Sequence, residues 1–281
     1  MMSQTNNNKE AYDIYIGGLG ITPSHHMTRE VEEVIRRSKE VFYLSNSYGC
    51  KEYLETLCPK VTDLYNLSYK EGSERLDAYN TMSATVINAA LNNSPVSFVL
   101  YGHPSVFCYP PRQILQAAQL LGLKVKVLPG ISSMDCIFSE LNLDPGLHGL
   151  QMYEATDLLL RQRPLQSDVP CLIWQVGTVE SVLYSKASNK PERFSRILNH
   201  LLKYYPSDHK IGAIFVSTYP LAPTKKIVFR LDEIESQYQY LHQGVTLYIP
   251  PTGIRPIVDE DLLEEIESVV HLRKLTNSPF E

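Results

Sequence analysis

The sequence predicts an α/β protein of two domains, the first with a mostly parallel sheet and the second with a mixed sheet. In the N-terminal half, short apolar runs alternate with helical patterns. Strands joined through helices pair in parallel by right-handed crossovers, so this order predicts helices on both faces of the first sheet. After about residue 165 the pattern changes to several strands and one long helix, and 281 residues is about the length of two domains.

Each element of the first domain has a local signal. The run 96–100 is almost entirely apolar, as expected of a central strand buried on both faces. Pro110 suits the first turn of a helix, Gly122 suits its end, and Ser132 with Asp135 forms a capping box. The expected strands are 14–16, 41–44, 96–100 and 124–128, and the expected helices are 28–38, 73–92, 110–122 and one that begins at Ser132.

The second domain follows a linker at 161–170 that contains Pro164 and Pro170. The stretch 259–270 near the C-terminus is expected to be one solvated amphipathic helix. The expected strands of the second domain are 171–176, 211–217, 226–230 and 245–249, with a helix at 192–205. The resulting division is a mobile N-terminus over 1–11, a first domain over 12–163, a second domain over 164–258 and an acidic segment over 259–281.

Composition and charge exclude several classes of protein. The 26 basic and 31 acidic side chains give a net charge of −5, so a general nucleic-acid binder is not expected. No apolar run approaches the roughly 18 residues that a membrane-spanning helix needs, and the N-terminus has no signal-peptide pattern. The five cysteines include no CxxC pair and indicate reduced thiols, so we expect a cytoplasmic protein without a metal site or a membrane partner.

Three glycine-containing loops follow strands of the first domain. Gly18-Leu19-Gly20 is half of a dinucleotide fingerprint, but Pro23 takes the place of the third glycine, which favours a tight structural turn over a nucleotide site. The loops 101–107 and 128–133 follow two further strands at the same edge of the sheet. Ligands bind outside the carboxyl ends of parallel strands, so these two loops are either a binding crevice or ordinary turns.

Tyr69, Arg75 and Tyr79 form another candidate group. Arg75 and Tyr79 are four residues apart, which on a helix puts them on one face. Because a fixed cation favours the phenolate, Arg75 would lower the pKa of the Tyr79 phenol. From spacing alone, however, most such pairs are half-solvated neighbours on a surface.

The same loops and several later segments resemble one family. They look like the tetrapyrrole methylase fold, which binds S-adenosylmethionine between two α/β domains, and more narrowly like the borosin peptide backbone α-N-methyltransferases. The similarity covers about residues 12–258. The segments that carry it are YGHPSVF at 101–107, LPGISSMDCIF at 128–138, DPGLHGLQMYEATDLL at 144–159, IWQVG at 173–177 and YIPP at 248–251.

The resemblance implies a site. The residues that match the family's reaction site are Tyr69, Arg75, Tyr79 and Tyr101, which replaces the surface-neighbour interpretation. Ser105 stands where fungal members usually have glycine, a departure that would alter how the loop holds the methionine end of the cofactor. The resemblance assigns S-adenosylmethionine, with S-adenosylhomocysteine as product, to Tyr101, His103, Val106, Phe107, Ser132, Ser133, Gln175, Ala213, Val245 and Thr246.

The chemistry of backbone methylation fits such residues. A peptide nitrogen shares its lone pair with the carbonyl and is a poor nucleophile, so it must lose its proton while charge moves onto the oxygen. Tyrosine hydroxyls aimed at that oxygen would stabilise the charge, and a phenolate beside Arg75 would take the proton. The sulfonium of the cofactor supplies the methyl group, and no metal is required.

The resemblance also implies partners. It implies a homodimer that acts on a ribosomal precursor peptide, hence a heterotetramer when two precursors bind. Residues 252–281 are dominated by acidic side chains and have no long β-branched run, so we expect a separate precursor that binds in trans. Two alternatives remain: a tetrapyrrole-type small-molecule methyltransferase, and a catalytically idle subunit that grips a peptide.

Overall fold

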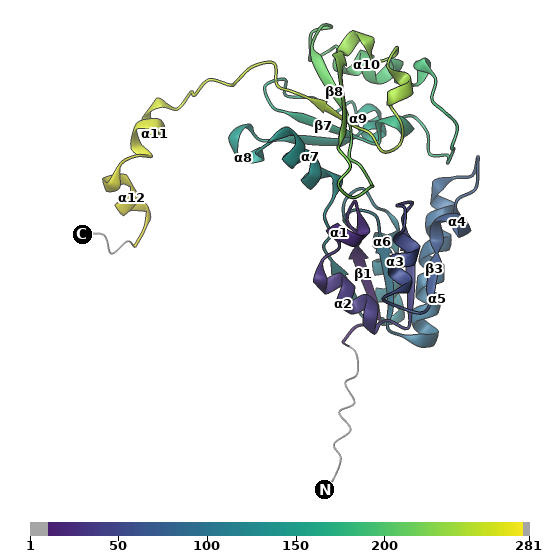
Figure 1. Ribbon diagram of the computed structural model, residues 1–281. Helices are drawn as coiled ribbons and strands as arrows, with labels where there is room; N and C mark the ends of the chain where they lie inside the picture. The colour runs from purple at the N-terminus through teal and green to yellow at the C-terminus, as the bar shows by residue number, and fades with distance from the viewer. Residues whose placement is uncertain (1–10, 278–281) are drawn as a thin grey trace.

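The computed structural model describes residues 11–277, and within them it contains two five-stranded sheets (Figure 1). The mobile N-terminus expected over 1–11 lies, except for its last residue, outside the described residues. No helix in the described part is long and apolar enough to cross a membrane. Each sheet has its own helices and its own apolar core, so the predicted α/β fold of two domains is confirmed.

The first sheet is entirely parallel, with the strand order β3-β2-β4-β1-β5. The central strand β4 is buried along its whole length, as its apolar sequence predicts. Short β3 was not expected from the sequence and occupies an edge of the sheet. The strands are β1 (Ile14–Gly18), β2 (Glu40–Leu44), β3 (Val61–Asp63), β4 (Val96–Leu100) and β5 (Val125–Leu128).

Helices cover both faces of this sheet. On one face, α2 and α3 contribute Val31, Ile35 and Leu54 to a core beneath Val99, and on the other, α5 and α6 form a second core around Phe98. Gly122 ends α6 in the left-handed conformation, and the predicted capping box opens α7. The helices are α1 (Pro23–His26), α2 (Arg29–Arg37), α3 (Cys50–Glu55), α4 (Leu64–Ser68), α5 (Arg75–Asn93), α6 (Pro110–Leu121), α7 (Ser133–Leu141) and α8 (Pro145–His148).

The second sheet is mixed, with the strand order β6-β7-β10-β8-β9. β6 pairs in parallel with β7, and the remaining pairs are antiparallel. Expected strand 171–176 ends at Trp174, because Gln175 adopts a left-handed conformation with φ of 56°. The strands are β6 (Gln151–Glu154), β7 (Cys171–Trp174), β8 (Lys210–Phe215), β9 (Lys225–Arg230) and β10 (Thr246–Ile249).

The boundary expected at residues 163/164 falls inside the second domain. β6 is a strand of the second sheet, and Ala155 and Leu158 of α9 (Ala155–Leu160) are fully buried in its core with Phe194. The proline-containing linker 161–170 is therefore the connection between α9 and β7 of one β-α-β unit. We place the change of domain before β6.

Two expected helices are shorter than the sequence indicates. The pattern at 192–205 gives a 3-10 turn, η2 (Pro191–Phe194), followed by α10 (Ser195–Leu201), and the chain then continues as turns bonded back to Leu198 and Leu201. The pattern at 259–270 is split into α11 (Glu260–Glu265) and α12 (Val269–Leu275), because the Ser268 side chain accepts from His271 and begins a new helix. Figure 1 shows α11 and α12 away from both sheets.

A small apolar group joins the two domains. Ile21 and Ile137 come from the first domain, and they pack with side chains of the second sheet. We call this group the junction cluster; its buried members are Ile21, Ile137, Leu172, Trp174, Ile214 and Val216.

Candidate functional site

A cavity of about 1360 Å³ lies between the two domains. Its lining comes from the loops after β2, β4 and β5 of the first domain and from the segment after β7 and the start of β10 in the second. Most of the residues singled out from the sequence meet here. They are Tyr69, Arg75, Tyr79, Tyr101, His103, Val106, Phe107, Ser132, Ser133, Gln175, Val245 and Thr246.

Ala213 is the exception among the expected cofactor contacts. It lies on β8, is 4% exposed and packs in the core of the second domain rather than on the cavity wall. Ser132 lines the cavity, but the residue is only 3% exposed. Its hydroxyl donates a hydrogen bond to the Asp135 carboxylate at 2.7 Å. Ser132 therefore holds the start of α7, and Ser133 is the more accessible of the two serines.

The three glycine loops meet through their backbones, and we call their contact the glycine floor (Gly18, Gly20, Gly102 and Gly130). A Cβ placed on Gly18 would lie 2.4 Å from the Gly102 carbonyl oxygen and 2.6 Å from Cα of Gly130. Gly20 bridges to Gly102 with a positive φ of 71°. Gly18 and Gly20 do not line the cavity, so the loop after β1 is the tight structural turn that the sequence favours.

The loop after β4 brings polar groups to the cavity. His103 accepts a hydrogen bond from the Ser105 backbone N–H on Nδ1 at 3.0 Å, which in the neutral ring leaves the proton on Nε2. Burial raises the pKa of Tyr101 to about 12, and Cys136 adds to this. The Tyr101 phenol is therefore a hydrogen-bond donor near neutral pH.

Two cavity residues have uncommon backbone conformations. Phe107 and Gln175 both have positive φ values, 49° and 56°, although neither is glycine. They come from different domains, and the Phe107 ring lies 5.4 Å from that of Trp174, the neighbour of Gln175. Such conformations are maintained where the surroundings fix them, and they are frequent at binding sites.

Aromatic side chains build one wall of the cavity. The ring of Tyr69 meets that of Tyr79 edge-on at 6.3 Å and stacks on Tyr184 at 4.6 Å with an interplanar angle of 23°. Tyr65 completes the group: its hydroxyl is bonded to that of Tyr184 at 2.8 Å, and its ring is 5.0 Å from Tyr69. We call these four residues the tyrosine wall.

The hydroxyls of Tyr69 and Tyr79 are bonded to each other, and burial raises the pKa of both phenols. Arg75 and the hydrogen bond from Tyr69 act in the opposite direction on Tyr79, but burial is the larger effect. The expectation that Arg75 gives Tyr79 a lowered pKa is therefore wrong in its net direction. Within the pair, Tyr69 donates and Tyr79 accepts, so the negative charge is better accommodated on Tyr79.

Arg75 also links the domains. It begins α5, and its guanidinium donates to the backbone carbonyls of Ser181 and Val182 in the second domain, at 3.3 Å for Val182. Its backbone N–H donates to the Val182 carbonyl at 3.0 Å. The charge that the sequence points to is thus held in place from the other domain.

Tyr65 and Tyr184 were not found from the sequence. Tyr65 precedes Tyr69 by four residues, about one helical turn, and this spacing could have indicated that the two lie on one face. Tyr184 lies in an irregular segment of the second domain, 115 residues from Tyr69 in the chain (184 − 69), and has no local signal.

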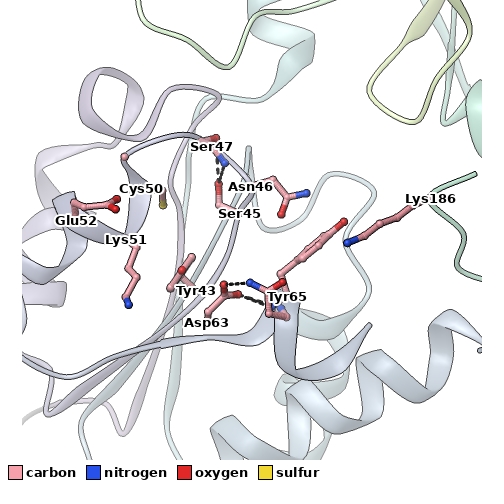
Figure 2. A pocket seen from close by; sticks show the side chains of 12 residues that line it. Tyr43, Ser45, Asn46, Ser47, Cys50, Lys51, Glu52, Asp63, Tyr65 and Lys186 are labelled. Atoms are coloured by element: carbon pink, nitrogen blue, oxygen red, sulfur yellow. Dashed lines mark hydrogen bonds between the residues drawn. The ribbon is translucent and has the colours of Figure 1, made fainter. Parts of the chain in front are cut away.

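A second, smaller cavity of about 600 Å³ adjoins the first (Figure 2). The two share Asn46, Tyr65 and Lys186 among their lining residues. Figure 2 shows the Lys186 side chain reaching toward Tyr65, and the Lys186 ammonium lies 5.9 Å from the centre of that ring. The lining is otherwise polar, and Asp63 caps α4 from within it.

Comparison with known proteins gives a family and a set of relatives. Residues 13–225 match the model of the Tetrapyrrole (Corrin/Porphyrin) Methylases. A methyltransferase/ribosomally synthesized type II borosin cyclic peptide precursor of Phlebiopsis gigantea is 30% identical over 252 residues, covering 89% of this chain and 45% of the relative. The cyclic peptide omphalotin A precursor of Omphalotus olearius, also a methyltransferase by name, is 29% identical over 268 residues, covering 94% and 63%. The chain thus spans less than two thirds of either relative.

Solved structures have the same fold. The methyltransferase CobJ superposes with a TM-score of 0.60 at 15% identity, covering 87% of this chain and 96% of that one. Uroporphyrin-III C-methyl transferase from Thermus thermophilus, in a complex with S-adenyl homocysteine, gives a TM-score of 0.56 at 15% identity, covering 84% and 91%.

Proposed function

The chain belongs to the tetrapyrrole methylase family, and from this premise we propose that it transfers methyl groups from S-adenosylmethionine to backbone amide nitrogens of a ribosomally made peptide. The observation that carries the proposal is the tyrosine wall beside Arg75 on the interdomain cavity. The borosin relatives, whose names join a methyltransferase to a cyclic peptide precursor, support a peptide substrate.

Residues of both domains fit the cofactor. The cavity has the backbone of two loops at the carboxyl edge of a parallel sheet, where ligands of α/β folds bind. It also offers the Ser133 hydroxyl, the Gln175 amide and the Phe107 ring, which suit a molecule with ribose, amino-acid and adenine parts. We assign cofactor binding to Tyr101, His103, Val106, Phe107, Ser133, Gln175, Val245 and Thr246. When bound, the sulfonium supplies the methyl group.

The tyrosine wall would act on the amide. Its nitrogen is planar and nearly non-basic, so transfer requires removal of the proton and stabilisation of charge on the carbonyl oxygen. We assign proton removal to Tyr79, which accepts from Tyr69 and faces the Arg75 charge. The Tyr101 hydroxyl would donate to the carbonyl oxygen, as in an oxyanion hole, while the Tyr69 hydroxyl stays bonded to Tyr79.

We propose that the peptide is a separate precursor that binds in trans to a homodimer, giving a heterotetramer with two precursors. A homodimer is supported by exposed leucines on adjacent helices, namely Leu91 of α5 and Leu115, Leu120 and Leu121 of α6. Such side chains suit burial against a second copy.

Mass spectrometry tests the proposal. The protein is incubated with labelled cofactor alone, with a valine-rich synthetic peptide, and with a tetrapyrrole. Label on backbone nitrogens of the peptide, located by fragmentation, is the expected result. Label within residues 252–281 of the protein would mean that it methylates itself, label on the tetrapyrrole would favour the small-molecule reaction, and cofactor binding without any transfer would contradict an enzyme.

A further inference from the structure

We propose that Tyr184 is a positioning residue for methyl transfer: it reaches from the second domain to fix the ring of Tyr69 against Tyr79. This inference rests on the proposed function and concerns the same site. Tyr184 is 6% exposed and lines the interdomain cavity, so its ring belongs to the wall that a substrate would meet.

The ring contacts hold Tyr69 from two sides. Tyr184 stacks on one face at 4.6 Å, and Tyr79 meets it edge-on at 6.3 Å. Tyr69 lies at the C-terminal cap of α4, beyond the regular helix, and its side chain also packs against the core around Phe98. Removing the Tyr184 ring would leave one face of the Tyr69 ring without support and loosen the hydrogen bond of Tyr69 to Tyr79.

Tyr184 itself is fixed at both ends. Its hydroxyl is bonded to the Tyr65 hydroxyl at 2.8 Å. Its backbone pairs with the first domain: the Gly72 N–H donates to the Tyr184 carbonyl and the Tyr184 N–H donates to the Ser73 carbonyl, each at 2.9 Å. A bridge between Glu74 and Leu183 continues this pairing, which we call the interdomain ladder.

The ladder also contains Arg75, whose backbone N–H donates to Val182. Arg75 of the first domain therefore reaches into the second, and Tyr184 of the second reaches into the first, where it stacks on Tyr69. Arg75 and Tyr69 are the two groups that lower the pKa of the Tyr79 phenol, and each is in contact with the segment 181–184.

Substitution of Tyr184, with cofactor Kd, kcat, KM and the pH–rate profile measured, tests the inference. Tyr184→Phe keeps the stack and loses the bond to Tyr65, so kcat should fall roughly threefold to tenfold. Tyr184→Leu also loses the stack and should lower kcat by roughly tenfold to a hundredfold. In both, cofactor Kd stays unchanged and the alkaline rise in rate moves to higher pH. The control is Tyr205→Phe, a buried tyrosine of the same domain whose hydroxyl has no partner, and its rate should match wild type.

If Tyr184→Leu does not fold, Tyr65→Phe paired with Tyr184→Phe decides the matter. Each should lower kcat to a similar extent and the double variant no further, because the two hydroxyls share one bond. Wild-type kcat in Tyr184→Phe and Tyr65→Phe, a loss confined to KM, or an equal loss in Tyr205→Phe would overturn the inference while leaving the proposed function standing. Wild-type protein that binds cofactor but methylates no peptide would overturn both.

Discussion

Three loops of the first domain touch through glycine backbone atoms, whereas one wall of the cavity consists of tyrosine rings drawn from both domains. A carbon added at Gly18 or Gly130 of the glycine floor would collide with the Gly102 carbonyl oxygen. In the tyrosine wall one lost hydroxyl would remove a hydrogen bond without a collision. Added atoms in the floor should therefore lower the stability of the protein, whereas lost atoms in the wall should lower the rate of methyl transfer.

Tyr79→Phe is the strongest test of the wall. It removes the proposed proton acceptor and should lower single-turnover methylation by about a hundredfold to ten-thousandfold, the usual contribution of a general base. Cofactor affinity, measured by calorimetry, should stay the same because the floor is unchanged. Tyr53→Phe on α3 is the control, since it lies outside the cavity lining. Near wild-type rates for Tyr79→Phe would break the comparison.

Cofactor binding tests the loops after β4 and β5, which line the cavity, without any mutation. Ligand that binds only the folded protein, at about 100 times its Kd, should add roughly 2.7 kcal/mol to the free energy of unfolding. Thermal shift with S-adenosylmethionine and with S-adenosylhomocysteine measures this. A shift of similar size is expected in Tyr79→Phe, and the absence of any shift with both ligands in wild type would refute the assignment of the site.

Gly18→Ala should destabilise the protein by about 1–3 kcal/mol, the usual cost of overpacking. The new carbon would meet the Gly102 carbonyl and the Gly130 Cα, both backbone atoms that no rotamer change can move aside. Denaturant unfolding measures the loss. Gly253→Ala, with nothing within 4 Å of the added carbon, is the control and should behave as wild type. Equal stability of the two variants would mean that the floor is not tightly packed.

A change of pH is expected to have a smaller effect, on the rate of transfer but not on cofactor binding. Burial raises the pKa of Tyr79, so the phenolate is scarce near neutral pH and increases as pH rises toward that pKa. The rate of transfer should therefore increase with pH by at most about tenfold per pH unit, while cofactor Kd changes little. Because the phenols are stabilised in the protonated form, stability should be fully present below their ordinary pKa of about 10 and decline as pH rises further. A rate that is flat with pH would contradict Tyr79 as the proton acceptor.

Both the floor and the wall were predicted only in part. The parallel strand order predicts that the loops 101–107 and 128–133 lie at one edge of the sheet, but the backbone contact of Gly18 with Gly102 and Gly130 was not predicted. The spacing of Arg75 and Tyr79 predicts a shared helix face but cannot indicate that the guanidinium reaches Ser181 and Val182. That contact joins residues more than a hundred positions apart, and nothing periodic marks the segment that supplies it.

The errors have similar causes. The proline-containing linker suggested a boundary after residue 163, but β6 pairs with β7 across it, a long-range choice that composition does not encode. Ala213, which the resemblance assigns to the cofactor, packs with the core on β8, and its assignment stays a prediction. In the acidic C-terminal segment, the amphipathic pattern suggested a single continuous helix. The Ser268 side chain instead caps the start of a second helix.

The junction cluster has a consequence for how the molecule melts. It has six buried side chains, and together with the interdomain ladder and the stack of Tyr184 on Tyr69 it joins two domains that each have a larger apolar core of their own. Two cores joined by contacts smaller than either core are expected to unfold as separate cooperative units, so calorimetry of the ligand-free protein should give two overlapping heat-absorption peaks with a calorimetric enthalpy above the van't Hoff value. A ligand that touches both domains links these units, and on its addition the two peaks should draw together into one.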